Sequence, residues 1–146
     1  MTTEPTDRSE GGNEDGLGDA LVQVAFLTMA VLTKIGAEHD LSLTQLRVLG
    51  ILRDRRPKMT VLADFLGLDK STMTGLVDRA TQRGLLDRSR DPADGRSVVV
   101  FLTEAGVRLA DDVHTEVMRS LATSTAQLGP ADRDRLRALL ERLLRR

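Results

Sequence analysis

The sequence predicts a mainly α-helical, single-domain fold with the element order α-α-α-α-β-β-α-α. Three observations carry this prediction. The chain has 146 residues, which is the size of one ordinary domain. Leucine-rich segments with apolar residues every three or four positions occur along most of its length, which is typical of packed helices. One pair of short segments, residues 85–90 and 98–102, is separated by turn-forming residues and predicts a β-hairpin.

The N-terminal part divides into a polar and an apolar segment. Residues 1–16 carry five acidic side chains and one basic one, so we expect a disordered acidic tail. Residues 17–38 predict a helix whose apolar surface is wider than one stripe, which favours contact with a partner subunit. Gln23 and Lys34 interrupt this window, so we expect a buried helix rather than a membrane span. The segment lacks signal-peptide features, and we expect a cytoplasmic protein.

Three further helices are predicted in the middle of the chain. Ser42 and Gln45 have the spacing of a capping box and predict the start of the first of them. Residues 60–66 and 70–83 predict two more helices, joined by a tight turn at Gly67, which can adopt a left-handed conformation. Two short helices joined in this way are the arrangement of a helix-turn-helix.

The start of the second helix of this pair carries short hydroxyl side chains. Such side chains suit phosphate oxygens and base edges when a helix N-terminus enters the major groove of DNA. Lys70 adds positive charge there, and Arg79 can reach a phosphate or a guanine edge. The candidate DNA-binding residues of this helix are Lys70, Ser71, Thr72, Thr74 and Arg79. A capped helix with solvated hydroxyls remains the alternative interpretation of this run.

The hairpin that follows is interpreted as a wing. Arg88 and Arg90 alternate onto one face of the first strand. Arg96 lies at the hairpin tip, where an arginine is well placed to enter a minor groove. Asp94 is expected to pair with Arg96 and fix its direction. The alternative is a turn with a surface salt bridge of little energetic value.

Two helices are predicted after the hairpin. Thr103 is expected to cap a helix that extends to about Thr125, and Gly129 and Pro130 begin the last helix. The leucines of that last helix repeat with helical spacing and form one apolar stripe. They are Leu136, Leu139, Leu140, Leu143 and Leu144.

Over residues 17–146 the chain resembles the MarR family of winged-helix transcriptional regulators. The segments that carry the resemblance are Gly84-Leu85-Leu86-Asp87-Arg88, Asp91-Pro92-Ala93-Asp94-Gly95-Arg96, Leu102-Thr103-Glu104-Ala105-Gly106 and residues 71–79. The resemblance implies a repressor that binds double-stranded DNA as a homodimer. Residues 17–40 and 104–146 would form the dimerisation helices, and residues 44–103 the winged domain, reading a pseudo-palindromic operator through both grooves.

The resemblance also implies a small aromatic or anionic effector that relieves DNA binding from a site between the dimerisation helices and the winged domain. In this sequence Phe26, Met29, His39 and Arg47 are the expected effector contacts, with His39 and Arg47 receiving an anion. The chain contains no cysteine, which excludes a thiol-based oxidant sensor. An orphan regulator without a ligand remains an alternative.

The charge distribution favours nucleic acid over the other function classes. The formal net charge is −1, but residues 44–103 carry eleven basic and seven acidic side chains, hence +4. A winged-helix protein-interaction module is the alternative, but such an interface would prefer exposed aromatic residues, and the chain has three Phe and no Trp or Tyr. No nucleophile and base pattern, phosphate loop or metal-ligand cluster is evident. We therefore expect no enzyme activity, no metal and no cofactor.

Overall fold

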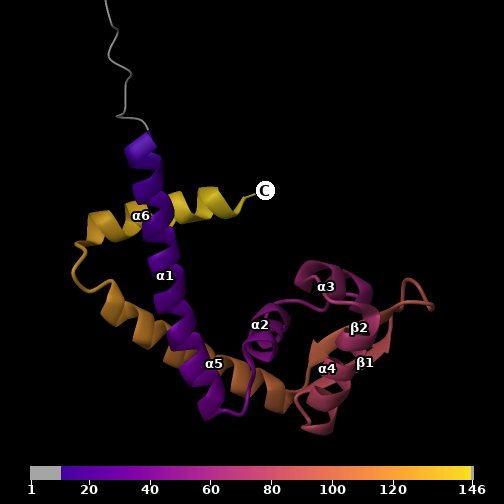
Figure 1. Ribbon diagram of the computed structural model, residues 1–146. Helices are drawn as coiled ribbons and strands as arrows, with labels where there is room; N and C mark the ends of the chain where they lie inside the picture. Colours follow the sequence, from indigo (N-terminus) through magenta and orange to yellow (C-terminus); the bar gives the residue numbers. More distant parts are fainter. Residues whose placement is uncertain (1–10, 146) are drawn as a thin grey trace, which may run out of the picture.

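The computed structural model describes residues 11–145 and has the predicted fold class and element order (Figure 1). Helices dominate, and the two strands pair antiparallel, with Leu86 opposite Leu102 and Arg90 opposite Val98. The elements are α1 (Gly11–Glu38), α2 (Leu43–Leu52), α3 (Met59–Leu66), α4 (Lys70–Gln82), β1 (Leu86–Arg90), β2 (Val98–Leu102), α5 (Glu104–Ser124) and α6 (Pro130–Leu144).

The boundary of the predicted N-terminal tail is wrong. α1 begins at Gly11, so residues 11–16 belong to the helix, and the rest of the predicted tail lies outside the described residues. Once a helix is nucleated by a long apolar segment, each added residue gains a backbone hydrogen bond. Glu14 in the first turn also interacts favourably with the positive end of the helix dipole.

The expectation that α1 is a buried helix also needs correction. Within Glu14–Glu38 an 18-residue window has a mean hydropathy of 1.7, so length and composition alone would allow α1 to cross a membrane. Only 11% of that window is buried. The apolar side chains of α1 therefore lie mostly on the surface of this single chain.

The winged part of the chain has a compact core beneath α4. Met73 and Val77 of α4 and Val100 of β2 have no exposed surface. Gly106 at the start of α5 is pressed against the wing, because a Cβ there would lie 2.0 Å from the Leu85 carbonyl oxygen. This close approach fixes the hairpin against the helix that leads out of the winged part.

The remaining helices, α1, α5 and α6, are called the arm helices. In Figure 1, α1 crosses in front of α6, and α5 extends from this region to the winged part, which comprises α2, α3, α4 and the hairpin. An ion pair of 2.8 Å between Arg53 Nε of α2 and Asp111 Oδ1 of α5 ties the two parts together. The fold thus separates the arm helices, of which α1 and α6 expose many apolar side chains, from a basic winged part.

Candidate nucleic-acid interface

The exposed start of α4 is built by an aspartate that the sequence interpretation did not single out. The carboxylate Oδ1 of Asp69 accepts hydrogen bonds from the Thr72 amide at 2.7 Å and the Ser71 hydroxyl at 3.1 Å. This is an N-cap, and it begins the helix at Lys70. The same bonds, that from the Thr72 amide above all, hold the pKa of the Asp69 carboxyl below its ordinary value.

The predicted hydroxyl side chains are not equivalent. Lys70, Ser71 and Thr72 are exposed, whereas Thr74 is half-buried. The Thr74 hydroxyl donates to the Lys70 carbonyl at 2.8 Å, so its hydrogen is used within the helix. The Ser71 hydroxyl likewise donates its hydrogen, to Asp69 at 3.1 Å, so Lys70 has the freest polar group at this end of α4.

Arg79 is brought to the same side of α4 as Thr72, seven residues earlier. Both line a shallow groove of about 360 Å³ together with Ser42 and Gln45 at the start of α2. Ser42 and Gln45 form the predicted capping box, with the Gln45 Oε1 accepting from the Ser42 amide at 2.7 Å. The groove therefore has polar walls from two helix starts, an arrangement suited to phosphate oxygens.

The tip of the wing is ordered by Asp94, but the predicted pairing of Asp94 with the Arg96 side chain is wrong. Asp94 accepts hydrogen bonds from the Ser97 hydroxyl at 2.8 Å and from the Arg96 backbone amide at 3.2 Å. The Ser97 bond contributes most to lowering the pKa of the Asp94 carboxyl, followed by the Arg96 amide and the charge of Lys58. A short aspartate satisfies nearby turn amides more readily than a long, solvated guanidinium.

Lys58 joins the wing from the segment between α2 and α3. Its ammonium lies 3.8 Å from an Asp91 carboxylate oxygen and 3.9 Å from one of Asp94. Its backbone also forms an isolated β-bridge to Val99, which ties this segment to the base of the wing. The positive charge of Lys58 thereby offsets part of the negative charge of the Asp91 and Asp94 carboxylates at the tip.

The two strand arginines take part in holding the wing together. Arg88 forms an ion pair with Asp78, which links the wing to α4. Arg90 donates to the Gly95 carbonyl at 3.1 Å across the tip. Both side chains are partly exposed, and the hydrogen bonds of their guanidinium groups stabilise the conformation of the wing.

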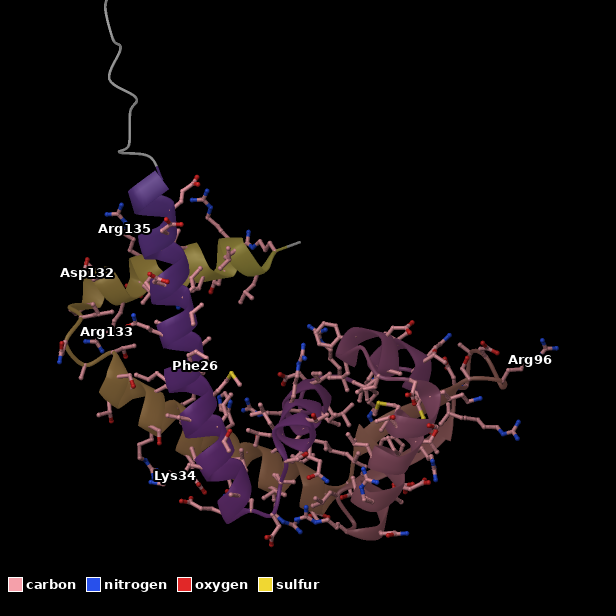
Figure 2. The ribbon with its side chains drawn as sticks, in the orientation of Figure 1. Phe26, Lys34, Arg96, Asp132, Arg133 and Arg135 are labelled. Atoms are coloured by element: carbon pink, nitrogen blue, oxygen red, sulfur yellow. The ribbon has the colours of Figure 1, made fainter. Side chains whose placement is uncertain are left out.

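Arg96 extends from the wing tip into solvent at the far end of the molecule from α6 (Figure 2). It nevertheless lines the same groove as Lys70, a hollow of about 450 Å³ between α3, the start of α4 and the wing. Among the described residues, no carboxylate forms an ion pair with Lys70, Arg79 or Arg96. α4 and the wing therefore share one hollow, in which Lys70 and Arg96 make no ion pair although the carboxylates of Asp64 and Asp69 also line it.

The four expected effector contacts do not come together in this chain. Phe26 (Figure 2) is exposed on α1, with 67% of its surface accessible, and Met29 on the same helix is exposed as well. His39 lies after the end of α1, and its Nε2 is 3.0 Å from a Glu116 carboxylate oxygen of α5. The Arg47 guanidinium stacks over the Phe65 ring at 5.2 Å from the centroid. The described residues thus present these side chains at separate places along the arms and α2.

Of the residues that sequence reasoning missed, Asp69 had a local signal. An aspartate directly before a predicted helix and three residues before Thr72 has the position of an N-cap. Lys58 and Asp78 had none, because their partners lie more than nine residues away and are chosen by the fold.

The capping role of Asp69 predicts an acid-dependent stability. Because its pKa is lower in the folded protein, the folded state binds fewer protons than the unfolded chain, and this stabilisation is present above the ordinary value of 3.8. It is lost as the pH falls through the folded-state pKa. In urea unfolding at a series of pH values, the wild type should exceed Asp69→Asn in stability near neutral pH, and the gap should shrink below pH 3.8. A gap that stays constant would remove the charged cap from the account.

Comparisons with known proteins agree with this geometry. A family model described as "MarR family" matches residues 39–97. YfiV, an uncharacterised helix-turn-helix regulator of Bacillus subtilis, is 30% identical over 129 residues, which cover 83% of this chain and 81% of the relative. NicR, a transcriptional repressor of Pseudomonas putida, is 28% identical over 79% of this chain and 73% of its own. The crystal structure of NadR in complex with 4-hydroxyphenylacetate has the same fold, with a TM-score of 0.73 at 23% identity over 99% of both chains.

Proposed function

The chain belongs to the MarR family of transcriptional regulators, and we propose that it binds double-stranded DNA as a homodimer. In this proposal α4 enters the major groove of each half-site, and the wing enters the adjacent minor groove. The observation that carries it is the shared surface of Lys70 and Arg96, which joins the recognition helix to the wing tip with no carboxylate of the described residues paired to either cation. The phosphates of a polyanionic duplex can pair with these two cations, which Asp64 and Asp69 of the same hollow leave without an ion pair.

The exposed apolar side chains of the arms support the homodimer. α6 has no buried residue, although it carries the predicted leucine stripe. α1 likewise exposes large apolar side chains along its length. A patch of this extent on a soluble chain marks an interface. The side chains concerned are Leu17, Leu21, Val22, Val24, Phe26, Leu27 and Met29 of α1 and Leu136, Leu139, Leu140, Leu143 and Leu144 of α6. A second copy that buries both helices would also account for the high hydropathy of α1 without a membrane.

The sign of regulation and the effector complete the proposal. The relative NicR is a repressor by name, and the structural neighbour NadR holds 4-hydroxyphenylacetate. We therefore propose a cytoplasmic repressor that a small aromatic or anionic molecule releases from DNA. Since Phe26 and His39 lie about 20 Å apart along a helix axis that rises about 1.5 Å per residue, an effector site that used both would need the partner subunit. An orphan repressor that responds to no such molecule is the second candidate.

Selection of bound duplexes tests the proposal. The wild type should enrich one pseudo-palindromic sequence from a pool of genomic fragments, because two equal reading heads meet one duplex. The Thr72→Ala variant should enrich a sequence that differs at a base position in each half-site, with an unchanged salt dependence, since Thr72 is expected to contact a base edge. Recovery of no common sequence by the wild type would contradict the proposed function. An unchanged preference with a weaker salt dependence would make Thr72 a phosphate contact.

A further inference from the structure

The end of α1 is a tightly constrained turn. The Leu41 amide donates to the Gly36 carbonyl at 2.8 Å, and the Asp40 amide donates to the Ala37 carbonyl at 3.2 Å. These are the two bonds of a Schellman motif, which requires one residue in the left-handed conformation. That residue is Asp40, with φ of 56°, and among the described residues it is the one non-glycine with positive φ. Such a conformation persists where neighbouring groups hold it.

The end of α4 closes in the same way. The Leu85 amide donates to the Ala80 carbonyl at 3.0 Å, and the Gly84 amide donates to the Thr81 carbonyl at 2.9 Å. Gly84 has φ of 73°. The backbone of Arg83, directly before Gly84, is therefore fixed as part of the closure of the recognition helix.

The Arg83 side chain connects these two helix ends. Its Nη1 donates to the Asp40 carbonyl at 2.8 Å, and its Nη2 donates to the His39 carbonyl at 3.0 Å. The two bonds use both terminal nitrogens of the planar guanidinium fork. In Figure 1 the turn after α1 and the lower end of α4 lie at the same edge of the molecule.

Electrostatics favour a cation at this place. Carbonyl groups at a helix C-terminus lack partners within the helix and carry the negative end of its dipole. α1 has no basic residue in its last turn, and Glu38 and Asp40 add negative charge. Arg83 thus supplies from α4 the cation that the end of α1 lacks.

The same turn is also held to α5. His39, whose carbonyl accepts from Arg83, has its imidazole Nε2 within 3.0 Å of a Glu116 carboxylate oxygen. The residues 39–40 therefore form a joint at which two of the arm helices, α1 and α5, meet the recognition helix. Arg83 is the member of this joint that belongs to α4.

We propose that Arg83 is a positioning residue for DNA recognition, which fixes the orientation of α4 relative to the arms and so sets the half-site spacing that the dimer accepts. This inference rests on the proposed function. Arg83 lies at the opposite end of α4 from Lys70 and Ser71, so it acts without touching DNA bases. Each subunit has one such joint. If the Arg83 hydrogen bonds are lost, α4 can change its orientation relative to the arm helices, and the distance between the two α4 helices of the dimer varies more widely.

Two variants and a matched control test this role. Arg83→Met keeps an unbranched side chain about as long as the aliphatic stem of arginine and removes both hydrogen bonds. Arg83→Lys keeps the charge, but its single ammonium does not reproduce the guanidinium fork on two carbonyls. Arg108→Met removes one exposed arginine of α5, which pairs with Glu104 within its own helix. Circular dichroism and thermal unfolding show whether each variant is folded, and Arg83→Lys decides the question if Arg83→Met is not.

The probe is the duplex that the wild type selects, together with versions whose central spacer is one base pair shorter or longer. We expect the affinity of the wild type to fall about tenfold when the spacer length changes. A loss of this size is comparable to that caused by one mismatched base pair in a specific site. Arg83→Met should reduce this penalty to about twofold and leave the salt dependence unchanged, because no phosphate contact is lost. Arg83→Lys should fall between them, and Arg108→Met should match the wild type. An unchanged spacer penalty, or a weaker salt dependence, would overturn the positioning role.

A readout without DNA separates this inference from the proposed function. The chain has no cysteine, so a spin label at Ser89→Cys on the exposed strand β1 reports the distance between the two winged parts of a dimer. Pulsed electron resonance should give a narrow distance distribution for the wild type and a broader one for Arg83→Met. A wild type that selects no duplex would contradict the function alone, whereas equal distributions in both proteins would contradict the role of Arg83.

Discussion

Replacing both Leu139 and Leu143 by aspartate should convert the protein to a monomer and lower its affinity for the selected duplex by about 10² to 10⁴-fold. The two leucines lie one turn apart on α6 and are 49% and 62% exposed in the single chain. A pair of carboxylates in an apolar interface is costly to desolvate. A monomer binds one half-site and forfeits the effective concentration that the second reading head gains from its partner. Sedimentation at micromolar concentration and duplex titration measure the two effects.

The control for this variant is Val61→Asp on α3, an equally exposed apolar residue of the winged part. It adds the same kind of charge and should leave the dimer intact. Because α6 contributes no buried residue, the winged core should unfold at the same denaturant concentration in the monomeric variant. A double aspartate variant that sediments as a dimer would refute the assignment of α6 to the interface.

Arg96→Ala should weaken duplex binding by about 100-fold. A charged side chain that contacts a groove contributes about 1–2 kcal/mol, and the dimer loses this contact at both wings. Arg96 makes no side-chain hydrogen bond or ion pair within the described residues, and its backbone amide rather than its side chain serves the turn. Folding and dimerisation should therefore be unaffected, which isolates the loss to DNA binding.

The comparison variant for Arg96→Ala is Arg108→Ala, which removes the same charge from the exposed face of α5. It should change the affinity by less than about twofold, since a distant charge is largely screened at physiological salt. Equal losses for the two variants would mean that Arg96 acts only through the net charge of the protein.

Local signals in the sequence predicted the helix ends and the wing strands well. Ser42, Gly67 and Thr103 were assigned as caps or turns from their immediate neighbours, and each has that role. The bonds that make these caps and turns lie within four residues, so they could be predicted locally, whereas the further bonds of Thr103 to the Gly84 and Leu85 carbonyls could not. The start of α1 was misplaced because polar and glycine residues can extend a helix that an apolar segment has nucleated.

Interactions between segments far apart in the chain could not be predicted from the sequence pattern. Arg83 reaches carbonyl groups 43 and 44 residues away, and backbone carbonyls leave no trace in residue identity. The Asp94 and Arg96 pairing failed for a related reason: an aspartate in a turn has amides and a hydroxyl within reach that compete for its oxygens. The expected effector residues lie on α1, in the turn after it and on α2, and residue types alone do not place these elements relative to one another.

Salt dependence of binding to the selected duplex tests the central claim most directly. We assign three cations of each chain to phosphates, namely Lys70, Arg79 and Arg96, none of which has an ion-pair partner among the described residues. A dimer that places all six on phosphates releases counterions in proportion. A plot of the logarithm of the association constant against the logarithm of the salt concentration should be linear with a slope of about −5. An affinity that stays constant as the salt concentration rises would contradict the account of this protein as a dimeric DNA-binding regulator.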